Sequence, residues 1–132
     1  MGIDLIPIIS NCIYARDSVF SGSGRERADC LMGFFGDSEI KSIFDVSGGD
    51  LGNEVLPYLD YDVIKNSQAT FWGYSDLTTI INAIYAKTGL VTYSGPHYSS
   101  FGMKYGLDYT LDYFKKLNIN DDIYFICGTD NL

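Results

Sequence analysis

Hydrophobic and polar positions recur along this chain with two different periods, and each period predicts a type of element. Short apolar runs with β-branched and aromatic residues predict buried strands over 42–46, 68–74 and 90–93. Apolar residues three and four positions apart predict amphipathic helices between these runs. Because strands and helices alternate, we expect an α/β fold of three layers, with flanking helices on a mostly parallel, flavodoxin-like sheet.

The segment 23–36 carries a clear start signal for a helix. Ser23 and Glu26 have the spacing of a capping box. Gly36 is predicted as the C-cap. The apolar residues between them fall on one helix face and are Ala28, Leu31, Met32 and Phe35.

The remaining elements follow from the same patterns. The clearest helix is predicted over 76–88 with Gly89 as its stop, and another over 108–117. Helical spacing also runs through 52–66, where Pro57 limits how far one helix extends. The remaining predicted strands are an N-terminal strand over Ile3–Ile9, placed at an edge or ended early by Pro7, and a final strand within 122–128.

Composition narrows the class of protein. A chain of 132 residues, 46% of them hydrophobic, predicts a single globular domain over residues 1–132. The net charge of −8 argues against nucleic acid and anionic membrane as partners, because both bind basic surfaces. The apolar N-terminus lacks a preceding positive region, so it is interpreted as a strand and not as a signal peptide. These features predict a cytoplasmic protein without membrane spans.

The three cysteines are odd in number and widely spaced. Cys12, Cys30 and Cys127 match neither a disulfide framework nor a zinc motif. We therefore expect reduced thiols.

Two predicted strand-to-helix turns, "SGGD" at 47–50 and "GYSD" at 73–76, carry the most suggestive chemistry. A serine on such a turn resembles the nucleophile elbow of α/β enzymes, although the second glycine of that motif is absent here. Ser75 or Asp76 would equally serve as an ordinary helix N-cap. Paired glycines either lend N–H groups to an oxyanion or simply close a turn. The local residues leave these alternatives open.

A longer resemblance covers both turns. "GGDLGNEVLPYLDYDVIKN" and "FWGYSDLTTIINAIYAKTGLVTYSGP" resemble the N-terminal domain of the LD-carboxypeptidase family of serine peptidases. "SGSGRERADCLMGFFGDSEIKSIF" and "GLDYTLDYFKKL" are similar to the family's segments before and after them. The match runs in order from about Ser21 to Leu117. Within the family, the likeness is strongest to the branch that includes the microcin C self-immunity peptidases.

The resemblance implies amide hydrolysis by a Ser-Glu-His triad without metal or cofactor. Its members remove a terminal D-residue from a muropeptide or cut a peptidyl- or aminoacyl-nucleotide. By motif match, Ser75 would be the nucleophile, and the N–H of Asp76 with one from Gly48 or Gly49 would form the oxyanion hole. The residues expected to contact substrate are Asp50, Gly95 and Pro96.

The family's Glu and His lie in a C-terminal domain, which we expect to be absent from a truncated chain. The family's opening strand and helix are also expected to be missing. No family motif gives His97 a triad role, and it is interpreted as an exposed loop histidine near the serine turn. We thus expect an enzyme domain that is nearly inert alone, with a homo-oligomer or a partner supplying the missing domain. The alternative is a non-catalytic paralogue that binds a ligand or only oligomerises.

Overall fold

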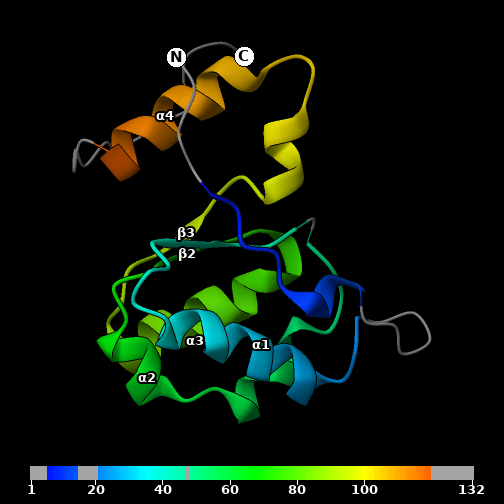
Figure 1. Cartoon of the computed structure of the whole chain (residues 1–132), viewed down its shortest axis with the longest axis vertical. Coiled ribbons are helices and arrows are strands. Elements are labelled where there is room, and N and C mark those ends of the chain that lie inside the picture. Colours follow the sequence, from blue (N-terminus) through cyan, green and yellow to red (C-terminus); the bar gives the residue numbers. More distant parts are fainter. Residues whose placement is uncertain (1–5, 15–20, 47, 120–132) are drawn as a thin grey trace.

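The computed structural model describes residues 6–14, 21–46 and 48–119, and within them it contains a three-stranded parallel sheet (Figure 1). The strands are β1 (Ser42–Phe44), β2 (Thr70–Gly73) and β3 (Thr92–Ser94), in the spatial order β1-β2-β3. Helices flank this sheet on both faces (Figure 1). The predicted α/β class with a parallel sheet is therefore confirmed.

One face of the sheet packs against three helices, α1 (Gly24–Gly36), α2 (Tyr61–Asn66) and α3 (Thr78–Thr88), which lie together below it in Figure 1. Ile43 and Phe71 are partners in the strand register and point into this layer. The core is mainly aliphatic, and most of its members come from the helices. Its buried members are Ala28, Phe35, Ile43, Val55, Leu59, Ile64, Ala69, Phe71, Ile80, Ile81 and Ile84.

The opposite face is aromatic. The register places Phe44, Trp72 and Tyr93 in one row, with ring centroids 5.7 Å and 4.3 Å apart. Helix α4 (Leu107–Ile119) covers this row with Phe114, whose centroid lies 5.6 Å from that of Phe44 and 5.5 Å from that of Trp72. Side chains alternate along a strand, so neighbouring residues point to opposite faces of the sheet. Ile43 and Phe71 therefore face the aliphatic core, and Phe44 and Trp72 face the aromatic row.

The predicted capping box is confirmed. The Ser23 hydroxyl accepts from the Glu26 N–H at 3.3 Å, and the Glu26 carboxylate accepts from the Ser23 N–H at 2.8 Å. The hydrogen bonds from the Ser23 backbone and hydroxyl hold the pKa of Glu26 below its ordinary value of 4.5.

The two predicted helix stops differ in outcome. Gly89 is the C-cap of α3 with φ +75°, the left-handed conformation that glycine favours. Gly36 is instead the last residue of α1, and the C-cap is Asp37 in an extended conformation. The prediction for Gly36 was wrong because α1 leaves directly into extended chain and needs no left-handed residue.

Pro57 limits its helix as predicted, because the segment divides into the 3-10 helix η2 (Gly52–Tyr58) and α2. Two further 3-10 helices, η3 (Ser75–Leu77) and η4 (Tyr98–Gly102), precede α3 and α4. None of the helices in the described residues combines the length and apolar character needed to cross a membrane.

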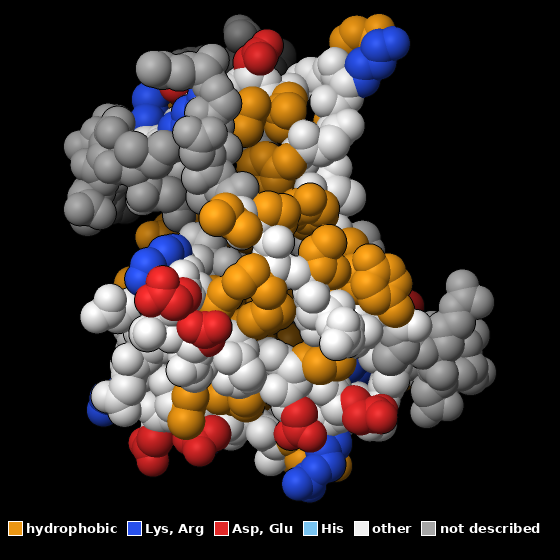
Figure 2. Space-filling model, in the orientation of Figure 1, with side chains coloured by type: hydrophobic (Ala, Val, Ile, Leu, Met, Phe, Trp, Pro, Cys, Tyr) orange, Lys and Arg blue, Asp and Glu red, His pale blue; other side chains and the backbone are white. Residues whose placement is uncertain are grey.

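The predicted N-terminal strand is wrong over the residues that the structure describes. Residues 6–10 pair with no strand, and a 3-10 helix, η1 (Asn11–Tyr14), follows. The side chains of Ile6, Ile8 and Ile9 are 92%, 59% and 52% exposed. Hydrophobic side chains also gather over the middle of the face shown in Figure 2. The predicted strand at 122–128 lies outside the described residues.

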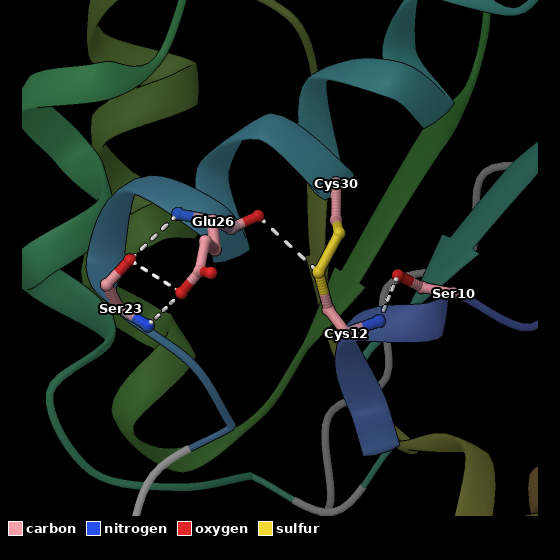
Figure 3. Close-up of a disulfide and its surroundings, with 5 residues drawn as sticks. All are labelled: Ser10, Cys12, Ser23, Glu26 and Cys30. Carbon is pink, nitrogen blue, oxygen red and sulfur yellow. Dashed lines mark hydrogen bonds between the residues drawn. A yellow bond between two sulfur atoms is a disulfide. The ribbon is translucent and has the colours of Figure 1, made fainter. Parts of the chain in front are cut away.

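The expectation of reduced thiols is corrected for two cysteines. Cys12 of η1 forms a disulfide with Cys30 of α1, with the Cα atoms 6.6 Å apart (Figure 3). The bond links residues 18 positions apart and so attaches the N-terminal segment to α1. Cysteine spacing does not show which residues the fold brings together, so this pair could not be predicted from the sequence. Cys127 lies outside the described residues.

Candidate functional site

Three loops meet at the carboxyl ends of the three strands, where ligands bind in open parallel α/β sheets. The glycine turn, Gly48 and Gly49, follows β1. The serine turn, Tyr74–Asp76, follows β2, and the Gly-Pro loop, Gly95–His97, follows β3. Parallel strands bring these loops to one edge of the sheet, so residues about 20 to 30 positions apart become neighbours.

Ser75 adopts a conformation that non-glycine residues rarely take. Its φ of +58° lies in the left-handed region, which costs an L-residue about 1–2 kcal/mol. Its side chain is exposed, and the N-terminus of α3 lies behind it. Neither Ser75 nor Asp76 caps that helix, since no side chain caps η3 or α3. The structure therefore favours the sharp strand-to-helix turn over the simple N-cap.

The glycine turn touches the serine turn. A Cβ atom built on Gly48 would lie 3.4 Å from the Cβ of Ser75. Gly48 also has a φ of +75°, so both the space and the backbone at this position favour glycine. The glycine turn at Gly48 and Gly49 and the serine turn thus form a single candidate site.

The N–H groups at this site are unequally available. Gly48 donates to the Asp45 carboxylate at 3.0 Å and is therefore occupied. The N–H groups of Gly49 and Asp76 have no acceptor among the residues that the structure describes. The Asp76 carboxylate accepts from the N–H of Gly52 and so ties the serine turn to the start of η2. Backbone N–H groups of this kind can stabilise an oxyanion.

The residues expected to contact substrate lie around this edge. Asp50 is exposed beside the glycine turn. Gly95 donates its N–H to the Gly73 carbonyl at 3.2 Å, and a Cβ there would lie 3.2 Å from the Trp72 ring. Pro96 is half-buried and follows it. Glycine at position 95 therefore lets the Gly-Pro loop pass close to Trp72.

His97 lies beside the serine turn but is half-buried, not exposed as expected. Its ring packs edge-on against Tyr74, with centroids 5.7 Å apart. Its Nδ1 atom is hydrogen-bonded to the hydroxyls of Ser99 at 2.8 Å and Ser100 at 3.1 Å. Within the described part of the chain, the Ser75 hydroxyl makes no hydrogen bond. No group of three metal-ligating side chains occurs there either.

A comparison with protein-family models matches residues 1–95 to the LD-carboxypeptidase N-terminal domain. The chain belongs to the LD-carboxypeptidase family. The resemblance seen in the sequence is thereby confirmed. Its likeness to the microcin immunity branch is confirmed by the similarity to MccF.

Relatives and solved structures agree with this assignment. YocD of Bacillus subtilis (strain 168) is 50% identical over 102 residues, which are 77% of this chain and 31% of YocD. The microcin C7 self-immunity protein MccF is a further relative, from Escherichia coli. A structure of MccF superposes with a TM-score of 0.78 at 38% identity. The match covers 83% of this chain and 33% of the MccF chain. The muramoyltetrapeptide carboxypeptidase of Oxalobacter formigenes gives a TM-score of 0.71 at 28% identity, covering 79% and 36%. This chain spans about a third of the length of these relatives.

Sequence reasoning missed one residue at this candidate site. Asp45 follows β1 directly, and its two carboxylate oxygens accept from Gly48 and from Tyr74. The only signal in the sequence was a charged residue at the end of an apolar strand, two positions before "SGG". Its two partners lie on different turns, so no local pattern could have identified them.

A shallow cavity of about 430 Å³ lies elsewhere on the molecule. Phe35, Asp60 and Asn66 contribute to its lining. These residues belong to the segments that lead into β1 and β2, at the opposite edge of the sheet from Ser75. In parallel α/β folds the carboxyl edge is the usual ligand site, so we place the candidate site at Ser75.

Proposed function

We propose that this chain is the nucleophile-bearing domain of a serine hydrolase that cleaves an amide by acyl-enzyme chemistry. One observation carries the proposal: Ser75 is held at φ +58° between a buried strand and a helix, with the glycine turn in contact beside it. Strained backbone of this kind persists when the surrounding structure enforces it, and it clusters at active sites.

In the proposed reaction, the Ser75 Oγ attacks the carbonyl carbon of the scissile amide. The carbonyl oxygen becomes an oxyanion, stabilised by the N–H of Asp76 and that of Gly49, because Gly48 is already bonded within the protein. Collapse breaks the C–N bond, and the serine proton passes through a base to the leaving amine. Water then hydrolyses the acyl-enzyme.

The substrate class follows from the relatives. The Oxalobacter relative is named a muramoyltetrapeptide carboxypeptidase, and MccF has been solved with aspartyl sulfamoyl adenosine. We therefore propose a muropeptide or a peptidyl- or aminoacyl-nucleotide as substrate. Asp50, Gly95 and Pro96 surround the Ser75 edge and would contact its polar groups and chain.

The general base would come from outside the described residues. A serine hydroxyl without an adjacent base is a poor nucleophile, and a dismantled triad keeps only about 10³–10⁴-fold acceleration over water. His97 lies near Ser75 but uses Nδ1 for Ser99 and Ser100. We propose that a Glu and a His supplied by a further domain or a partner chain complete the triad.

The Ser75 hydroxyl, which has no hydrogen-bond partner among the described residues, favours a second candidate function. A turn that keeps its shape without a base would still bind a carbonyl or carboxylate through the N–H groups of Gly49 and Asp76. The chain would then be a ligand-binding module of the same family, without turnover.

Hydrolysis followed by mass spectrometry tests the two functions. The substrates are an L,D-tetrapeptide and an aminoacyl sulfamoyl adenosine, and the variants are Ser75→Ala and the matched control Ser38→Ala. Ser38 is exposed and lies in the loop that leads into β1, far from the site. Slow turnover lost only in Ser75→Ala supports the hydrolase. Turnover that survives Ser75→Ala overturns it, while binding without turnover favours the module.

Self-association is also expected. Ile6, Ile8 and Ile9 expose apolar surface on the N-terminal segment, and large exposed apolar patches are rare on monomers. Sedimentation velocity at increasing concentration should show a dimer or larger species. A clean monomer at high concentration would contradict this expectation.

A further inference from the structure

We propose that Asp45 is a positioning residue, which holds the serine turn and the glycine turn in register so that their N–H groups face one substrate oxygen. The inference rests on the proposed function, since that oxygen is the oxyanion of the amide being cleaved. Its first basis is the carboxylate of Asp45. Oδ1 accepts the N–H of Gly48 at 3.0 Å, and Oδ2 accepts the N–H of Tyr74 at 3.2 Å.

Each oxygen therefore holds a different loop. Gly48 is next to Gly49 in the glycine turn, and Tyr74 is next to Ser75 in the serine turn. Hydrogen bonds to an ionised acceptor are shorter and stronger than neutral ones. One side chain thus fixes the residues on either side of the Gly48–Ser75 contact.

The backbone of Asp45 is itself fixed. Its N–H donates to the Trp72 carbonyl at 3.1 Å, which extends the ladder between β1 and β2 by one residue. Its carbonyl accepts the N–H of Tyr98 at 2.8 Å, and the next carbonyl, of Val46, accepts that of Ser99 at 3.1 Å. The start of η4, which directly follows the Gly-Pro loop, is therefore attached to Asp45 and Val46. The carboxylate acts from a rigid point of the sheet.

The chemistry requires a carboxylate. Two acceptor oxygens are needed for two N–H donors, and asparagine offers one acceptor and one amino group. An Asp45→Asn substitution can satisfy one turn but sets an N–H group against the other. The carboxylate also determines which glycine N–H remains for substrate, because it occupies that of Gly48 and leaves that of Gly49.

Amide hydrogen exchange measured by NMR on the full chain tests the two hydrogen bonds of the Asp45 carboxylate without any need for catalysis. In the wild type the Gly48 and Tyr74 amides should be protected. In Asp45→Ala both should exchange roughly ten- to 100-fold faster, and in Asp45→Asn only one of them should. The Asp45 amide, bonded to Trp72, should stay protected and report an intact sheet. Unchanged protection of both amides in Asp45→Ala would overturn the proposal.

Asp37→Ala is the matched control. Asp37 also bonds a loop N–H through its carboxylate, that of Glu39 at 2.9 Å, but before β1 instead of after it. This variant should accelerate exchange at Glu39 and leave Gly48 and Tyr74 unchanged. Equal changes at the site in both variants would mean a general loosening and would overturn a specific role for Asp45.

The rate at which a fluorophosphonate modifies Ser75 tests the functional consequence. In that reaction the Ser75 oxygen bonds to phosphorus, fluoride leaves, and the hydroxyl proton goes to solvent. Asp45→Ala should slow modification by about ten- to 100-fold because the donors no longer converge, and Asp37→Ala should not. Equal rates in wild type and Asp45→Ala would overturn the positioning role. No modification of the wild type would show that Ser75 is not reactive in this chain alone and would favour the ligand-binding module. The exchange data would then decide whether Asp45 holds the two turns together.

Discussion

The face of the sheet that packs against α1, α2 and α3 and the carboxyl ends of the strands lie a few residues apart in the chain, yet they are built differently. Phe71 of β2 is buried among the side chains of the aliphatic core. Four positions later, Ser75 is exposed, has a left-handed backbone and sits among hydrogen bonds to carboxylates. The first region is stabilised by removing apolar surface from water. The second is held in an unfavourable shape by the first.

The contrast shows where backbone strain is tolerated. A left-handed serine persists only when its surroundings determine its position. Here β2 fixes the residue before the turn and α3 the residues after it. Asp45 bonds the turn at Tyr74, and the carboxylate of Asp76 attaches it to Gly52. We therefore expect substitutions in the core to lower stability and substitutions at the carboxyl edge to alter the site.

The largest effect is expected in the core. Ile84 is fully buried in α3, so Ile84→Ala should lower the free energy of unfolding by about 2–5 kcal/mol through lost burial and a cavity. Tyr85, its exposed neighbour on the same helix, supplies the control Tyr85→Ala, which should change little. Urea denaturation measures both. Similar losses in the two variants would contradict the assigned core.

A smaller loss is expected at the glycine turn. Gly48→Ala places a Cβ on a residue with φ +75° and 3.4 Å from Ser75, which should cost about 1–2 kcal/mol and reduce modification of Ser75. Gly89 has the same φ but open space around it, so Gly89→Ala should lose stability without affecting Ser75. A loss of Ser75 reactivity in both variants would argue against the contact between the turns.

A gain in stability, not a loss, is expected at Ser75. Ser75→Gly relieves the left-handed strain and should raise the free energy of unfolding by roughly 0.5–1 kcal/mol. Activity that depends on the hydroxyl should vanish in the same variant. Ser38, which has an ordinary φ, provides the control Ser38→Gly, and this substitution should destabilise slightly. A destabilised Ser75→Gly would show that the turn stores no strain.

The smallest expected effect is on the pH dependence of stability, through Glu26, which is far from the site. Glu26 has a lowered pKa in the folded chain, so its carboxylate stabilises α1 above the ordinary value of 4.5. This contribution is lost as pH falls below 4.5 and through the lowered folded pKa. Glu26→Gln should therefore be less stable than the wild type near pH 6, with the difference in stability shrinking as pH falls below 4.5. Thermal unfolding followed by circular dichroism measures it, with the exposed Glu39→Gln as control.

Much of the fold could be predicted because its signals are local. The capping box at Ser23, the Gly89 stop and the limit at Pro57 each depend on residues within one or two turns of chain. The apolar runs that form β1, β2 and β3 are equally local. Ile6, Ile8 and Ile9 formed the same kind of run but no strand, because a strand requires a partner that the pattern does not reveal.

The sequence by itself therefore determined the element types, their order and, through the family resemblance, the importance of Ser75 and the glycine pair. Only the tertiary structure decided the Cys12–Cys30 disulfide, the contact between Gly48 and Ser75, and the two bonds of Asp45. Each of these joins residues that are not adjacent in the chain. Parallel strands bring the ends of such segments together, and that proximity arises only once the sheet has formed.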